Sequence, residues 1–393
     1  MQRLLARGLV LMGTMILAWA GAFTSARMNA DLTALLSQGP RVAGTPAGRA
    51  AGDYLAAELK KVGYTVEFQP FSYSRTRDQG SNLKVGDKDI PVNALSGSPA
   101  GRLEAPLVVV MGIGRAEDYI GLNARGAIVV VRRGGIPFLE KARQAATVGA
   151  LGMVVVNNTS GNIRGTFGGG GPIPGVTVSQ EEGQALLGQS GTKAVLDVRT
   201  VSEEVQARNV IARRGTGNPQ AIVGAHYDSV VGAPGANDNA SGTVTVLELA
   251  RDLAHSPISQ RVWFVWFDGE EDGLWGSRKF VAANPDLVRG LRAMLNLDMV
   301  GIDVLGKLGM GGDAQLFGLA QQSADLEQVS LQDLGANEGG SDHVPFAQAG
   351  VPVLFFTWGL DANYHQPGDK IADLALMAQA GRVARGVLER VVQ

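Results

Sequence analysis

The sequence predicts an α/β fold: a mixed, mostly parallel sheet flanked by helices, with a small inserted β-rich domain. In the second half of the chain, apolar strand-like runs alternate with helical stretches, as in proteins whose helices cover a sheet. The uninterrupted apolar run 262–267 suits a parallel strand buried on both faces. Residues 75–203 instead show short apolar runs between glycine-rich turns, which indicates a separate β-rich unit.

The composition allows a large core and excludes several classes of function. The chain has 393 residues, of which 45% are hydrophobic and 18% charged. That length is enough for two or three domains of roughly 100–200 residues. A net charge of −2 does not suggest a nucleic-acid surface. Because cysteine is absent, disulfides, thiolate metal ligands and a cysteine nucleophile are all excluded.

The N-terminus resembles a secretory signal peptide. Residues 1–26 combine two early arginines, an apolar stretch at 8–19, and small residues suited to cleavage after Ala20 or Ala26. The apolar stretch is short for a membrane span, which needs about 20 residues. We therefore expect an exported protein, periplasmic or secreted from a bacterium, without stable membrane insertion after cleavage. The alternative is an uncleaved membrane anchor.

Each element has its own signal. A helix is expected within 44–65, where apolar residues recur at helical spacing, and a half-buried strand at 66–73. In the insert, strands are expected at 105–112, 126–135, 152–161 and 174–179, with a helix at 138–150. Further strands are expected at 209–214, 221–226, 261–268, 291–301 and 351–359, with helices at 240–254 and 375–392. Residues 27–74 and 204–393 would then form one domain and residues 75–203 the insert.

Metal-ligand residue types occur in or just after several predicted strands. In open α/β sheets, sites form beyond the carboxyl ends of the strands, so residues far apart in sequence can meet there. The neighbouring Glu270 is free to act as a base. The candidate ligands are His226, Asp238, Glu271, Asp298 and His365.

Their number favours two metal ions over one. Histidine and carboxylates are the ligands expected for zinc without cysteine, although cobalt and manganese also accept them. One zinc takes about four ligands, whereas five are present and three are carboxylates that can bridge. Asp228 lies two residues after His226 and could orient its ring. The alternatives are an ordinary hydrogen-bonded histidine at a strand end and a solvated turn at Glu270 and Glu271.

Six motifs resemble the M28 family of co-catalytic zinc peptidases, the aminopeptidase Y-like group. They are AHYDS (225–229), GANDNASG (235–242), FDGEEDGLWGS (267–277), NLDMVG (296–301), SDHVPF (341–346) and YHQPGD (364–369). The resemblance runs from about residue 40 to the C-terminus. Within the insert, residues 126–158 resemble a protease-associated (PA) domain. The resemblance implies a zinc-dependent exopeptidase fold holding two zinc ions.

The resemblance also implies residue roles. His226 and Asp298 would bind one zinc, Glu271 and His365 the other, and Asp238 would bridge them. Glu270 would act as general base and then general acid. Tyr364 would donate to the tetrahedral oxyanion. A non-proline cis peptide bond is expected at Asp238–Asn239.

The expected activity is removal of N-terminal residues from peptide substrates. A carboxypeptidase or dipeptidase of the same family is an alternative, although no distinctive arginine cluster lies near the motifs. A receptor-like binding protein is a third, which the complete ligand set disfavours. The same ligand set disfavours a single-zinc glutaminyl cyclase.

The insert could cover the cleft or be a surface appendage. His343 could support the site or the fold, and His255 is expected at the surface or as a helix cap.

Overall fold

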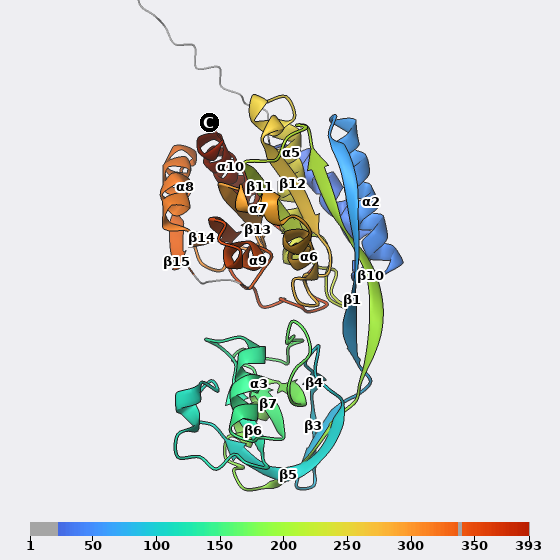
Figure 1. Ribbon diagram of the computed structural model, residues 1–393, viewed down its shortest axis with the longest axis vertical. Helices are drawn as coiled ribbons and strands as arrows, with labels where there is room; N and C mark the ends of the chain where they lie inside the picture. The colour runs from blue at the N-terminus through green and yellow to red at the C-terminus, as the bar shows by residue number, and fades with distance from the viewer. Residues whose placement is uncertain (1–22, 337–339, 393) are drawn as a thin grey trace, which may run out of the picture.

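Two α/β units joined by a long two-stranded ribbon make up the molecule (Figure 1). The computed structural model describes residues 23–336 and 340–392. The apolar stretch of the predicted signal, 8–19, lies outside the described residues. Within the described ranges, no helix is both long and apolar enough to cross a membrane.

The larger unit contains an eight-stranded mixed sheet. Its four central strands are parallel to one another, and the strands beside them pair antiparallel. This arrangement confirms the predicted fold class. In sheet order the strands are β1 (Thr65–Asp78), β10 (Thr200–Arg213), β12 (Val262–Phe267), β11 (Ala221–His226), β13 (Ala293–Leu297), β16 (Val353–Thr357), β14 (Leu308–Gly312) and β15 (Leu331–Gly335).

Helices cover both faces of this sheet. Strand alternation divides the core: Val223 and Phe264 pack on one face, while Ile222 and Val265 pack on the other. The first face is covered by α1 (Ser25–Leu36), α2 (Pro46–Lys61), α5 (Gly242–Leu253), α8 (Ala314–Glu327) and α10 (Leu374–Val391). The second is covered by α6 (Trp275–Ala283), α7 (Pro285–Arg289) and α9 (His343–Gln348). A short 3₁₀ turn, η3 (Pro257–Gln260), precedes β12.

The inserted unit has its own eight-stranded sheet and two apolar clusters. The strands predicted within 105–179 are present, together with the predicted helix α3. In sheet order the strands are β3 (Lys88–Pro91), β2 (Asn82–Val85), β9 (Lys193–Val198), β5 (Gly101–Val109), β6 (Ile128–Arg132), β7 (Gly152–Val156), β8 (Gly175–Val178) and β4 (Asn93–Ala94). The helical segments are η1 (Ala116–Tyr119), α3 (Phe138–Thr147) and α4 (Gln180–Leu186).

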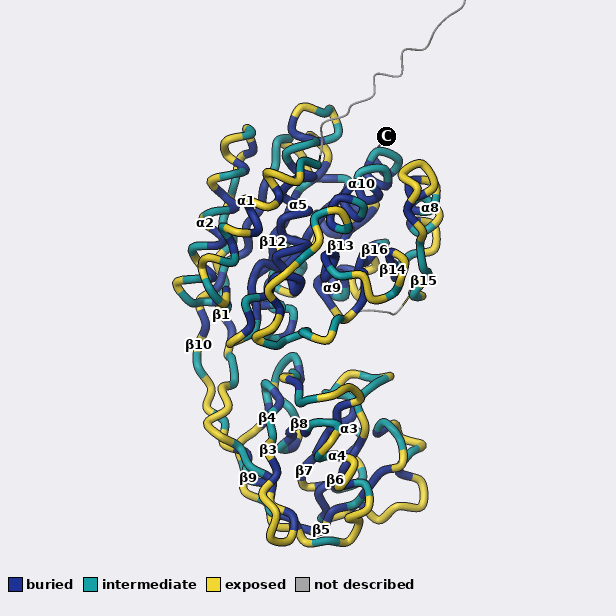
Figure 2. Tube along the Cα trace, turned by 180° about the vertical axis from the view of Figure 1, so that it is seen from behind, coloured by how far each residue is buried: buried dark blue, intermediate teal, exposed yellow. Residues whose placement is uncertain are grey.

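The ribbon is longer than the sequence predicted. β1 and β10 pair without a break from Thr65 with Arg213 to Asp78 with Thr200. The far half of the ribbon is largely exposed or half-buried (Figure 2), so its residues are mostly polar and give no apolar strand signal. Both predicted domain boundaries, 74/75 and 203/204, lie within this ribbon.

Candidate metal centre

The five predicted ligands meet at the carboxyl ends of the central strands. His226 ends β11, Asp298 directly follows β13, and Glu271 lies on the loop after β12. Their side chains form groups that could each hold a metal ion. One group is His226, Asp238 and Asp298, and another is Asp238, Glu271 and His365. Asp238 belongs to both.

The two carboxylate oxygens of Asp238 face different groups. Its Oδ1 lies 3.3 Å from Nε2 of His226, and its Oδ2 lies 3.2 Å from Nε2 of His365. The same His226 nitrogen is 3.4 Å from Oδ1 of Asp298. The same His365 nitrogen is 2.9 Å from Oε2 of Glu271. Asp238 thus turns one carboxylate oxygen toward each of the two candidate groups.

Three of these four separations, at 3.2–3.4 Å, fit tetrahedral zinc coordination, and the 2.9 Å between His365 and Glu271 is shorter. With bonds of about 2.0–2.1 Å, the ligand atoms of a tetrahedral zinc lie roughly 3.3–3.4 Å apart. Among the described residues, several buried atoms of the groups have no hydrogen-bond partner, including Oδ1 of Asp298 and Oε1 of Glu271. Buried acceptors without partners are unfavourable unless a cation or water meets them. The residues present therefore fit a pair of zinc ions.

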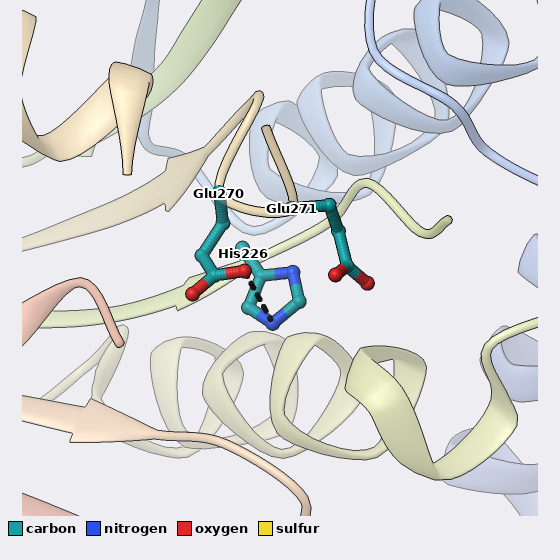
Figure 3. Close-up of side chains that lie close together, drawn as sticks. All are labelled: His226, Glu270 and Glu271. Atoms are coloured by element: carbon teal, nitrogen blue, oxygen red, sulfur yellow. Dashed lines mark ion pairs between the residues drawn. The ribbon is translucent and has the colours of Figure 1, made fainter. Parts of the chain in front are cut away.

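Glu270 and Glu271 are adjacent but point in different directions. In Figure 3, the Glu270 carboxylate turns toward the His226 ring, whereas that of Glu271 turns away to the other side. Oε2 of Glu270 is 4.0 Å from Nε2 of His226, farther than the Asp298 oxygen at 3.4 Å. Glu270, His226 and Glu271 form a third possible metal-binding group. Because of this longer distance, Glu270 is better placed to lie beside a bound metal ion than to be one of its ligands.

Asp228 supports this part of the site from behind. Its two carboxylate oxygens accept the backbone N–H groups of Glu270 and Glu271, at 3.2 and 3.3 Å. Its Oδ1 also lies 3.5 Å from Nδ1 of His226, at the limit of a hydrogen bond. Asp228 is almost completely buried. Asp228 thus holds the backbone of Glu270 and Glu271. That it also orients the His226 ring stays a prediction.

The turn carrying Asp238 is held by groups from distant segments. The peptide bond Asp238–Asn239 is cis, as predicted. Asp369 accepts three successive backbone N–H groups: its carbonyl oxygen accepts that of Ala236, and its carboxylate accepts those of Asn237 and Asp238. The Asn239 side chain bonds Leu297 and Met299, which flank Asp298. Hydrogen bonds therefore connect the Asp238 turn to the segment that carries His365 and to the segment that carries Asp298.

A buried arginine fixes the approach to this turn. Arg41 is fully buried and donates to the carbonyl oxygens of Tyr227, Pro234 and Gly235. Burial lowers the pKa of Arg41 to about 10, against the opposing effect of Asp228 and other carboxylates. Arg41 was not predicted from the sequence, because its partners lie about 190 residues away. Asp369 lies within the YHQPGD motif (364–369), but nothing local in the sequence indicates that it holds the Asp238 turn.

The carboxylates outnumber the imidazoles, and this shifts several pKa values. Burial and repulsion from Asp238 raise the pKa of Glu271 to about 7. Burial raises the pKa of Glu270 well above its usual range, and Glu271 adds to the effect. Burial opposes a charged His365, but Glu271 and Asp238 raise its pKa to about 10. Divalent cations would neutralise this excess of negative charge.

The structure also places the other singled-out residues. Tyr364 stacks on the ring of His365, with centroids 3.8 Å apart. Burial raises the pKa of Tyr364 well above its usual value, and Asp238 adds to this, so its hydroxyl stays protonated. His343 is buried and stacks on Phe355, whereas His255 is exposed after α5.

Asp342 was not singled out in the sequence, although it lies in the SDHVPF motif. It is fully buried, and burial raises its pKa to about 7. Its charge contributes to the raised pKa of Glu270. Asp342 therefore adds to the negative charge of the site.

Comparison with known proteins shows which family the chain is related to. A model of peptidase family M28 matches residues 209–389, and a model of the PA domain matches residues 103–186. Aminopeptidase YwaD from Bacillus subtilis is 32% identical over 384 residues, covering 90% of this chain and 82% of that protein. The solved aminopeptidase from Aneurinibacillus sp. strain AM-1 has a TM-score of 0.79 at 30% identity, covering 95% of each chain. The zinc aminopeptidase BSAP from Bacillus subtilis has a TM-score of 0.73 at 30% identity, covering 94% of this chain and 96% of that one.

These matches extend across both units and the ribbon between them. The M28 model covers the segments that contain His226 to His365, and the PA model covers most of the insert. The sequence motifs had predicted both assignments. The chain therefore belongs to peptidase family M28 and carries an inserted PA domain.

Proposed function

We propose that the protein is an exported di-zinc aminopeptidase that removes N-terminal residues from peptides. The observation that carries the proposal is the division of the Asp238 oxygens between His226 and His365, at 3.3 and 3.2 Å. The names of the similar proteins, aminopeptidase and zinc aminopeptidase, support the activity and the metal.

In this proposal, His226 and Asp298 would hold one zinc, Glu271 and His365 would hold the other, and Asp238 would be shared between them. When bound, paired zinc ions would activate a water molecule and polarise the scissile carbonyl. The protein supplies fixed ligand positions, because strand ends and the hydrogen-bonded Asp238 turn hold the side chains. Asp228 orients His226 and the backbone of Glu270 and Glu271.

Glu270 moves the proton in this mechanism. It accepts a proton from the attacking water and delivers it to the departing amine, as general base and then general acid. Burial is the first cause that raises the pKa of Glu270 above the usual range of a carboxyl, which makes its carboxylate a stronger base. The Tyr364 hydroxyl, kept protonated by burial, donates to the oxyanion of the tetrahedral intermediate.

Export is proposed from the N-terminal residues. The arginines, the apolar stretch and the small residues in 1–26 form a signal-like segment. A periplasmic or secreted location follows if this segment is cleaved. Fractionating the producing cells and sequencing the N-terminus of the mature protein would test the location and the cleavage together.

The activity is tested by metal analysis combined with a substrate screen. We expect two zinc ions per chain and hydrolysis of aminoacyl chromogenic substrates with a free amino group. The same substrates with a blocked amino group should not be cleaved. Cleavage of blocked substrates would exclude an aminopeptidase and favour a carboxypeptidase or other peptidase. If the zinc-loaded protein hydrolyses no aminoacyl or peptide substrate, a binding function is favoured.

A further inference from the structure

The inserted unit contacts the metal-bearing unit through the ribbon and through one loop. We call residues 162–171 of the insert the rim loop. In Figure 1 this green loop reaches from the insert toward the larger unit. Its Thr166 hydroxyl donates to the carbonyl oxygen of Asp272, at 3.4 Å. The carbonyl oxygen of Asn162 accepts from the side-chain amide of Gln366, also at 3.4 Å.

Asp272 is held by the ribbon as well. Its carboxylate accepts the Tyr73 hydroxyl at 2.5 Å and lies 3.3 Å from Nη1 of Arg75. Arg75 is itself fixed, because it also binds Glu203 on the other ribbon strand. The Tyr73 ring stacks on Trp275, the first residue of α6, with centroids 5.3 Å apart. The ribbon therefore holds the short loop between β12 and α6 through contacts of Tyr73 and Arg75.

Both loop attachments lie directly beside ligands of the same proposed zinc ion. Asp272 follows Glu271, and Gln366 follows His365. Glu271 and His365 belong to one ligand group, which they share only with Asp238. Within the described ranges, no hydrogen bond or ion pair joins residues 79–199 to residues 225–228 or 297–299, which contain His226 and Asp298.

Glu271 is thus fixed from two sides. On one side its backbone N–H donates to Asp228, within the metal-bearing unit. On the other side its neighbour Asp272 is held by Tyr73, Arg75 and Thr166, which come from the ribbon and the insert. Beyond Asp272 the chain turns sharply, with positive φ at Gly273 and Leu274. Backbone hydrogen bonds from Gly273 and Leu274 to the carbonyl oxygen of Glu270 close this turn. The contacts of Asp272 attach the closed turn, and with it Glu271, to the ribbon and the insert.

We propose that the insert and its ribbon position the Glu271 and His365 half of the metal centre, with Asp272 as the positioning residue. The PA domain is then part of the support of one zinc site and not only a cover or an appendage. This inference rests on the proposed two-zinc site. Groups that orient metal ligands commonly affect metal affinity by about 10–100-fold when they are removed.

The test measures each metal-binding step in variants of the full-length chain. Metal-free protein is titrated with Zn²⁺ by calorimetry and with Co²⁺ by absorption spectroscopy. The step that disappears in Glu271→Gln identifies the relevant site. In Asp272→Asn and Tyr73→Phe we expect that step to weaken about 10-fold or more. The step assigned to His226 and Asp298 should stay unchanged.

Tyr64→Phe is the matched control. Tyr64 is 4% exposed and Tyr73 is 5% exposed, and the Tyr64 hydroxyl also makes one buried hydrogen bond, to the carbonyl oxygen of Ala250. Tyr64→Phe should lower the unfolding temperature of the metal-free protein yet leave both binding steps unchanged. Circular dichroism of each variant checks that it is folded.

Two outcomes overturn the inference while the proposed function stands. Either both steps are unchanged in Asp272→Asn and Tyr73→Phe, or both weaken equally. A wild-type protein that binds a single zinc would instead refute the two-zinc proposal, and the inference would fail with it.

Discussion

Replacing Glu270 by glutamine should remove most of the hydrolytic activity and leave both metal ions bound. Glutamine has the same shape but cannot accept or deliver the proton. Glu270 is 4.0 Å from the His226 nitrogen, whereas the Asp298 oxygen is at 3.4 Å. Ligand atoms on one tetrahedral zinc lie roughly 3.3–3.4 Å apart. The Glu270 oxygen is therefore farther from the His226 nitrogen than the spacing expected between two ligands of one tetrahedral zinc.

The expected loss follows from the role of the carboxylate. A positioned general acid or base contributes about 10²–10⁴-fold to a rate. Because Glu270 would serve in two proton transfers, we expect kcat to fall by about 10³–10⁴-fold. This corresponds to about 4–6 kcal/mol in the activation barrier, at about 1.4 kcal/mol for each tenfold change. KM should change little, since the side-chain volume is retained.

The assay compares kcat and KM of wild type and Glu270→Gln on an aminoacyl chromogenic substrate, together with zinc content. Glu117→Gln is a control at an exposed site of the insert and should match wild type. If Glu270→Gln keeps more than about a tenth of the wild-type kcat, Glu270 is not the general base. If it binds one zinc fewer, Glu270 is a ligand.

Three further results are expected. Asp369→Asn should weaken zinc binding by about 10-fold or more in a titration, because the Asp369 carboxylate holds the backbone of the turn that carries Asp238; unchanged affinity contradicts this role. In the metal-free protein, burial raises the pKa of Glu271 to about 7. The folded protein therefore binds the Glu271 proton more tightly than the unfolded chain does. The stability that this proton contributes is complete below about pH 4 and is lost as pH rises through 7, so unfolding temperatures should fall between pH 5 and 8. Zinc should stabilise the protein more at the higher pH, since its ligands must be deprotonated. Finally, Thr24 donates its backbone N–H to the fully buried Glu248. A chain lacking residues 1–26 should therefore lose about 1–3 kcal/mol of unfolding free energy relative to one cleaved after Ala20; equal denaturant midpoints would count against this.

Strand positions and the clustering of the candidate ligands could be predicted because their signals are local. The run 262–267 is apolar throughout and forms β12, and the acidic pair Glu270 and Glu271 follows it directly. His226 and Asp298 likewise lie at the ends of β11 and β13. Once parallel strands are inferred, their carboxyl ends must share one edge, so the ligands converge.

Some elements could not be predicted because their residues give weak local signals. The far half of the ribbon is polar and exposed, and its strand conformation depends on pairing across more than 100 residues of chain. Helix α1 begins at Ser25, inside the segment assigned to the signal peptide, and its identity as a helix becomes evident from packing on α5. Neither β14 nor β15 is long or apolar enough to stand out, and each is only five residues long.

The sequence by itself determined which residue types make up the candidate metal centre and which strand ends carry them. Only the tertiary structure decided how these residues are divided between the two candidate groups and which contacts hold them in place. It placed the two Asp238 oxygens toward different histidines, brought Arg41 and Asp369 to the same turn, and set the insert against Asp272. The physical reason is that strand and helix signals depend on neighbouring residues, whereas these contacts depend on how distant segments pack together.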